Sequence, residues 1–108
     1  MEMVMAASSP ALDRELVRLG GYIRSWRKIL GLTVQITAAR AGVSRDTIRA
    51  VETGQSTSSE NLLAVMRTVG ILANVIDAAD PVNSDFGSRN LGRANVERVR
   101  TPRQQVGI

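Results

Sequence analysis

The stretch AARAGVSRDTIRAVETG, residues 38–54, decides the fold of this chain. Gly42 predicts the end of one helix, because glycine adopts the left-handed C-terminal conformation without a Cβ clash. Ser44, two residues later, is a typical helix N-cap, since its side chain accepts a hydrogen bond from a backbone N–H of the next turn. A second helix, from Ser44 to about Glu52, therefore follows after a tight turn, and Gly54 ends it.

This second helix has one apolar and one polar face. Its polar N-terminal part carries Arg45 and Arg49, on the side away from Val43, Ile48 and Val51. A short helix with such a face, crossed by the helix before it, has the geometry that enters the major groove of DNA. The alternative is an ordinary helical hairpin whose charged face is simply solvated.

The composition narrows the class of protein. The chain has 108 residues and is 44% hydrophobic, which suits one small domain with a tail, and its three aromatic residues predict a mainly aliphatic core. It has no cysteine and no histidine, which excludes disulfides, thiolate metal sites and imidazole catalysis. A phosphate-binding glycine loop and a clustered carboxylate pair are also missing from the sequence. We therefore expect no enzyme activity, no metal and no cofactor.

Basic charge is concentrated in two parts of the chain. Residues 12–56 carry eight basic and four acidic side chains, residues 57–83 carry one and three, and residues 84–108 carry five and two. Thirteen of the fourteen basic residues are arginine, which suits bidentate contacts with phosphate and guanine. A nucleic-acid partner fits this better than a membrane. Because the sequence has neither a signal peptide nor an apolar membrane span, we expect a cytoplasmic protein.

Hydrophobic periodicity and cap residues predict five helices and an all-α fold. The first runs from Pro10 to about Leu30, and its apolar stripe includes Trp26, which we expect in the core. The Gly20-Gly21 pair interrupts this stripe, so a kink or a separate short N-terminal helix is the alternative to one helix that runs to about Leu30. The other helices are expected from Val34 to Ala41, from Ser44 to about Glu52, from Ser58 or Ser59 to Gly70, and from Leu72 to Ala79.

These patterns divide the chain into three parts: a flexible N-terminus, residues 1–9, a helix-turn-helix domain, residues 10–80, and a basic C-terminal tail, residues 81–108. Pro81 stops the last helix, and apolar density falls beyond it. We expect the tail to be extended or mobile in the free protein. Its mixture of arginine and apolar residues suits folding on a partner, which is either a protein or DNA; a solubilising tail without a partner is the alternative.

Residues 31–54, from Gly31-Leu32-Thr33 to Glu52-Thr53-Gly54, resemble the helix-turn-helix of the phage-repressor-like (XRE) family in their AGVS…I…E.G spacing. Within that family the sequence is similar to HipB-type antitoxins. Their Asp-Pro, Asp-Leu-Gly and Arg-Val-Arg motifs have counterparts in Asp80-Pro81, Asp85-Phe86-Gly87 and Arg98-Val99-Arg100. The resemblance implies a five-helix repressor-like domain and a dimeric repressor whose partner is a HipA-like Ser/Thr kinase toxin.

The resemblance also assigns roles to side chains. It implies an ion pair between Arg27 and Glu52 that ties the first helix to the end of the third. In the tail it implies that Phe86 and the Arg98-Val99-Arg100 cluster dock onto the kinase. A stand-alone transcriptional regulator without a toxin, and an interaction adaptor with a degenerate helix-turn-helix, are the alternatives to an antitoxin.

On double-stranded operator DNA we expect Arg45 and Arg49 to contact bases, and Arg27, Gln35 and Thr53 to hold the backbone. We expect Asp46 to be solvated or paired with Arg45, because a carboxylate near phosphate is repelled. The full set of candidate DNA-binding residues is Thr33, Gln35, Ser44, Arg45, Asp46, Thr47, Arg49 and Thr53.

One recognition helix contacts too few base pairs for useful specificity, so we expect a homodimer that binds two half-sites one helical turn apart. The last predicted helix, with Leu72, Val75 and Ile76, is the candidate interface. The alternative is that these side chains only complete the core of the monomer.

Overall fold

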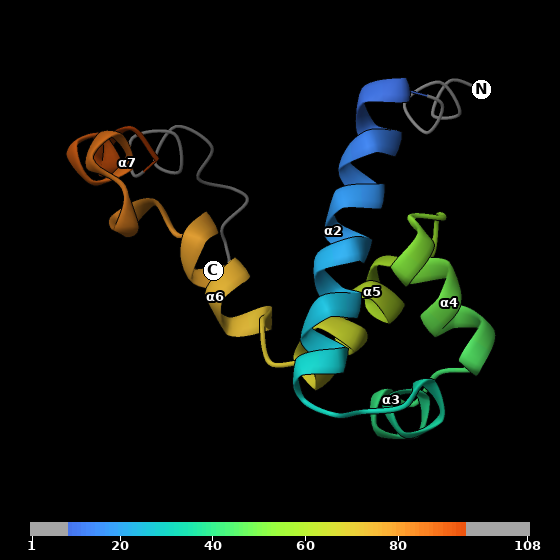
Figure 1. Ribbon diagram of the computed structural model, residues 1–108. Coiled ribbons are helices and arrows are strands. Elements are labelled where there is room, and N and C mark those ends of the chain that lie inside the picture. Colours follow the sequence, from blue (N-terminus) through green and yellow to red (C-terminus); the bar gives the residue numbers. More distant parts are fainter. Residues whose placement is uncertain (1–8, 95–108) are drawn as a thin grey trace, which may run out of the picture. The chain divides into compact units, whose positions relative to one another are not determined.

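The computed structural model describes residues 9–94, and over this range the chain is all-α with no strand. The chain forms two compact units, residues 1–72 and residues 73–108. Figure 1 shows α2 as the longest element, with the shorter helices of the first unit gathered beside its C-terminal half. The elements are α2 (Pro10–Ile29), α3 (Val34–Ala41), α4 (Arg45–Thr53), α5 (Ser59–Thr68), α6 (Leu72–Ala79), the 3₁₀ helix η1 (Pro81–Asn83) and α7 (Asp85–Arg89).

Side-chain caps begin the helices where the sequence predicts them. Ser9, Thr33, Ser44 and Ser58 each accept a hydrogen bond from the backbone N–H three residues later, at the starts of α2, α3, α4 and α5. Left-handed glycines follow the same four helices, with Gly42 at a φ of 74° between α3 and α4. Local chemistry at both ends of each helix therefore fixes the boundaries.

Residues 34–37 form a helix although they are β-branched and alternating, a pattern that by itself favours a strand. Thr37 is fully buried, and its hydroxyl donates to the carbonyl oxygen of Thr33 at 2.8 Å. This bond satisfies the one polar group that the threonine brings into the core. Tertiary packing thus overrides the local propensity of α3.

The core of the first unit is small and aliphatic. α2 packs on α4, and α3 packs on both α4 and α5. Leu72, at the start of α6, is half-buried against the same core. The buried hydrophobic residues are Ile23, Ala38, Ala41, Ile48, Val51, Val65, Met66 and Val69.

α2 is one continuous helix through Gly20 and Gly21, so the kink and the separate short helix are not formed. Gly20 is buried, and a Cβ there would overlap the carbonyl oxygen of Val51 in α4. Nothing lies within 4 Å of the corresponding position at Gly21. The first glycine is therefore needed for close approach of two helices rather than for a break in one.

The prediction that Trp26 lies in the core is wrong, because its side chain is 44% exposed. The buried residues of α2 are Gly20, Ile23 and Arg27, which follow one line along the helix. Trp26 precedes Arg27 by one residue, or about 100° of rotation, and so lies at the edge of the covered face. Leu12 and Leu30, at the two ends of the same stripe, are also about half exposed.

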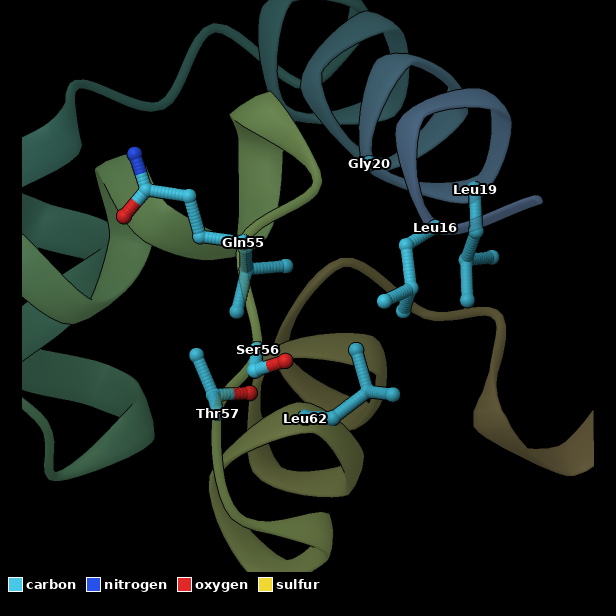
Figure 2. Close-up of a pocket in the computed structure, with 8 residues that line it drawn as sticks. Leu16, Leu19, Gly20, Gln55, Ser56, Thr57 and Leu62 are labelled. Carbon is cyan, nitrogen blue, oxygen red and sulfur yellow. The ribbon is translucent and has the colours of Figure 1, made fainter. Parts of the chain in front are cut away.

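A small cavity of about 100 Å³ lies between α2, the segment after α4, and α5. Figure 2 shows Leu16 and Leu19 of α2 facing Leu62 of α5 across this space, with Ser56 and Thr57 at its edge. Packing here is incomplete, which explains why Leu16 and Leu19 are only half-buried.

The second unit contains helical turns where an extended tail was expected. Asp80 caps η1 and Ser84 caps α7, so residues 81–83 and 85–89 are helical rather than extended. The cap residues are the feature of the sequence that indicates these turns. The side chain of Ser84, for example, accepts a hydrogen bond from the N–H of Gly87 at 2.9 Å. Phe86 is 67% exposed on α7. Residues 98–100, the other part of the predicted partner-binding tail, lie outside the described residues.

Among residues 9–94 no single helix has the length and hydropathy of a membrane span; α5 and α6 reach them only as a bent pair.

Candidate nucleic-acid interface

A three-residue connection, residues 42–44, joins α3 to α4. The N–H groups of Gly42 and Val43 both donate to the carbonyl oxygen of Ala38, at 2.9 and 3.0 Å, which closes the end of α3. Ser44 then begins α4 by accepting from the N–H of Thr47 at 3.1 Å. Backbone groups at the end of α3 and at the start of α4 are thus hydrogen-bonded within a short turn, and this fixes how the two helices cross.

The two faces of α4 separate as the sequence predicts. Ile48, Val51 and Glu52 are buried, whereas Arg45, Asp46 and Arg49 are exposed. Together with Ser44, the three exposed residues line a hollow of about 390 Å³ at the N-terminal end of the helix. This polar end of α4 is free within the described part of the chain to meet another molecule.

Asp46 is paired with Arg49 and not with its neighbour Arg45. Its Oδ1 lies 3.7 Å from Nη1 of Arg49, one helical turn away, and the two side chains are 96% and 63% exposed. An exposed pair of this kind contributes about 0–1 kcal/mol, so Arg49 is readily released toward another acceptor.

An ion pair between Arg27 and Glu52 joins α2 to the C-terminal end of α4. Nε and Nη2 of Arg27 donate to the two carboxylate oxygens of Glu52, the second at 3.1 Å, and Nη1 donates to the carbonyl oxygen of Leu32 at 2.9 Å. The two side chains are 11% and 6% exposed. Hydrogen bonding to Glu52 raises the pKa of Arg27, against the opposing effect of burial, so the guanidinium stays charged.

A second hollow, which we call the seam pocket, lies where α2 meets α4 and the start of α3. Its volume is about 390 Å³. It is lined by Arg24, Arg27, Val34, Arg49, Glu52 and Thr53. Arg24 was not among the site residues expected from the sequence. It could have been found from its spacing of three residues from Arg27, which places both arginines on one face of α2.

The hydroxyl groups of the candidate DNA-binding residues already make some hydrogen bonds within the protein. Thr53 donates to the carbonyl oxygen of Arg49 at 2.8 Å, so only its lone pairs remain. Thr33 accepts from the N–H of Ile36 at 3.0 Å and keeps its proton for another acceptor. The hydroxyls of Ser44 and Thr47 lie 3.0 Å apart and share one hydrogen bond. Gln35 is exposed on the first turn of α3.

The candidates of α3 and α4 all belong to the first unit, where Ser44, Arg45, Asp46 and Arg49 line one hollow and Arg49 and Thr53 line the seam pocket. Phe86 belongs to the second unit, and Arg98, Val99 and Arg100 are not among the described residues.

Comparison with protein families finds a match in the central part of the chain. Residues 18–79, more than half of the chain, match the model of the helix-turn-helix domain. No curated protein matches the chain significantly, and neither does any solved structure.

Proposed function

The chain belongs to the helix-turn-helix domain family, and on this premise we propose that it is a transcriptional repressor that binds operator DNA in a sequence-specific manner. The observation that carries the proposal is the exposed N-terminal face of α4, where Arg45 and Arg49 border a polar hollow while the opposite face is buried. Helices with this arrangement place their N-terminal residues against base edges in the major groove.

In this proposal Arg45 and Arg49 contact bases, and Arg27, Gln35 and Thr53 hold the backbone, with Thr33, Ser44 and Thr47 at the edge of the contact. An arginine that binds guanine in a bidentate manner contributes about 1–3 kcal/mol of discrimination. Arg27 also has a positional role, because its bonds to Glu52 fasten α4 to α2. Thr53 accepts rather than donates, since its proton is used within α4.

A footprint on DNA selected from a random library tests these assignments. Replacement of both Arg45 and Arg49 by alanine should remove the protected sequence while binding to arbitrary duplex persists at low salt. Gln35→Ala should weaken all sequences about equally, because a backbone contact carries no base information. An unchanged footprint with the double variant would contradict the role of α4 in base contact.

We further propose that the protein acts as a homodimer. Two recognition helices about 34 Å apart fit half-sites one helical turn apart. Exposed Val75 and Ile76 of α6 support a role for this helix in the interface, whereas Leu72 packs against the core of its own chain. Val75 and Ile76 thus fit the hypothesis of a dimer interface, and Leu72 fits the alternative that this helix completes the core of the monomer.

The partner proposed from the resemblance is a HipA-like Ser/Thr kinase toxin, with the chain as its antitoxin. Support comes from the second unit, where Val82, Phe86 and Leu91 are exposed apolar side chains within a short, strongly polar segment. Such a set suits a protein surface that is covered by a partner. A stand-alone regulator without a toxin, and an adaptor without DNA binding, remain the competing proposals.

We further propose that the repressor is cytoplasmic. We also assign it no enzyme activity, because the two hollows beside α4 are lined chiefly by arginine and hydroxyl groups, and the carboxylates of Asp46 and Glu52 are held in ion pairs.

A further inference from the structure

α2 carries two stripes of regularly spaced residues, and within residues 9–94 one of them is left largely uncovered. The buried line of Gly20, Ile23 and Arg27 faces the core of the first unit. A second set of positions, on the side of α2 next to that line, extends over about five turns. We call it the outer stripe, and its members are Leu12, Glu15, Leu19, Tyr22, Trp26 and Ile29.

The outer stripe is exposed over most of its length. Tyr22 is 56% exposed and Ile29 is 70% exposed, while Leu12 and Trp26 are about half exposed. Leu19 packs partly against the core. Soluble proteins rarely leave a long continuous apolar surface uncovered, and such a surface indicates contact with another molecule.

The spacing of the outer stripe matches a second copy of the same helix. Its intervals are three, four, three, four and three residues, and this order is the same from either end. Two copies of α2 that run in opposite directions therefore bring Leu12 opposite the partner's Ile29. They also bring Leu19 opposite the partner's Tyr22. Alternating intervals of this kind form the contact between helices that pack side by side.

The charged member of the stripe finds a counterpart in this antiparallel arrangement. Glu15 lies opposite the partner's Trp26, whose indole N–H needs an acceptor when it is covered. A carboxylate oxygen of Glu15 accepts from Arg18 at 3.0 Å, and the guanidinium of Arg18 lies 6.0 Å from the centre of the Tyr22 ring. The carboxylate is thus held beside the apolar surface, and its other lone pairs remain for a second donor.

The charges on α2 favour the antiparallel direction over the parallel one. A parallel pair brings Glu15 against the partner's Glu15 and Arg18 against the partner's Arg18, so like charges repel. In the antiparallel pair Arg18 lies near the partner's Ser25, which is uncharged. Arg14 and Lys28 lie farther round the helix, away from the outer stripe.

We propose that α2 binds α2 of a second copy of the chain, in antiparallel orientation, through the outer stripe. The contact is symmetric, because each copy presents the same surface. One face of a single helix covers less than the about 800 Å² per partner of a standard interface, so the contact is weak, with a dissociation constant on the order of 1 mM. It is separate from the homodimer interface proposed for α6, and at high local concentration it joins two such dimers. It does not depend on DNA binding.

Cross-linking tests the proposal directly, because the chain has no cysteine of its own. Leu12→Cys and Ile29→Cys each place one thiol at an end of the outer stripe, where the native side chains are exposed. A short bismaleimide is added, at millimolar protein, to each full-chain variant alone and to their equimolar mixture. The mixture should give a covalent dimer and neither variant alone should, because the antiparallel contact brings position 12 to position 29 of the second copy. No product in the mixture, or as much product from one variant alone, would overturn the proposal.

Trp26 provides a second readout, because it is the sole tryptophan and its indole N–H gives one resonance. This resonance should shift as the parent chain is concentrated from micromolar to millimolar. Tyr22→Asp places a charge in the middle of the outer stripe and should abolish the shift. Ser25→Asp adds the same charge beside Arg18 of the second copy and should keep it.

Thermal melting confirms that both variants are folded, since each replaced side chain is exposed. A parent resonance that does not change with concentration would overturn the proposal, whether the stripe stays open or another part of the same chain covers it. An undiminished shift in Tyr22→Asp would overturn it as well.

Discussion

Gly20 of α2 lies directly against the backbone of Val51 in α4, so close that a Cβ at Gly20 would overlap the Val51 carbonyl oxygen. The carbonyl carbon of Glu52 would lie 3.0 Å from the same Cβ. Two turns further along α2, Arg27 binds the side chain of Glu52. The position of α4 is therefore set by a close backbone contact and an ion pair on the same line of α2.

The close contact predicts a large effect of one methyl group. Gly20→Ala should lower the free energy of unfolding by about 1–3 kcal/mol, because the backbone of α4 must move away. Gly21→Ala is the matched control: nothing lies within 4 Å of its Cβ, so removing a helix glycine should stabilise the protein by about 0.5–1 kcal/mol. Urea unfolding of the two variants measures both values. Similar effects of the two substitutions would show that the helices do not approach so closely.

The buried ion pair between Arg27 and Glu52 predicts that its loss lowers the free energy of unfolding far more than the loss of an exposed ion pair. Glu52→Ala leaves a buried guanidinium without its carboxylate and should cost on the order of 3–5 kcal/mol. Glu15→Ala is the control, because it removes a partner of Arg18 in a pair whose side chains are 62% and 65% exposed. That change should stay within about 1 kcal/mol. A melting temperature of Glu52→Ala close to that of Glu15→Ala would mean that the pair contributes little.

Helix boundaries in the first unit were predictable because they depend on local chemistry. Ser44, Gly42 and Gly54 specify ends that need no knowledge of the rest of the fold. The exposure of Trp26 was not predictable in this way, because it depends on which neighbouring helix covers α2 and at what angle. Likewise, the buried role of Gly20 follows from a contact with a residue 31 positions later.

The candidate site was predictable in part for the same reason. The polar face of α4 follows from its helical period, and Arg27 and Glu52 followed from the family resemblance. Arg24 was missed because its place in the site depends on a hollow formed by three helices. The helical turns of residues 81–89 were missed because low apolar content was given more weight than the caps at Asp80 and Ser84.

The proposed dimer predicts a change of mass when α6 is made polar. Ile76 is 55% exposed, so Ile76→Asp should convert the dimer to a monomer without lowering the melting temperature of the first unit. Asn74→Asp, also exposed on α6, adds the same charge as a control. Analytical ultracentrifugation at micromolar concentration measures the mass. A parent chain that is already monomeric would contradict the dimer, and a dimeric Ile76→Asp variant would exclude α6 as its interface.

The second unit predicts separable roles for partner binding and DNA binding. Phe86→Ala removes an apolar side chain that is 67% exposed on α7, so it should weaken binding to a HipA-like kinase and leave operator affinity intact. Truncation after Pro81 removes the whole tail and should have the same outcome in a stronger form. Pull-down with the kinase and anisotropy with the operator provide the two measurements.

A truncated chain with lower operator affinity and a shallower salt slope would instead assign the tail to DNA. If both measurements were unchanged, the tail would have neither role.

Sequence-specific DNA binding is the central claim, and the affinity of the unmodified full chain for two duplexes tests it most directly. One duplex is the sequence selected by the protein from a random library, and the other is its scrambled counterpart of equal length. Between about 50 and about 200 mM salt we expect log K to fall linearly with log salt on both duplexes. We also expect the selected sequence to bind at least about a thousandfold more tightly at each salt concentration. Equal affinity for the two duplexes, or no binding to either at the lowest salt, would contradict the account.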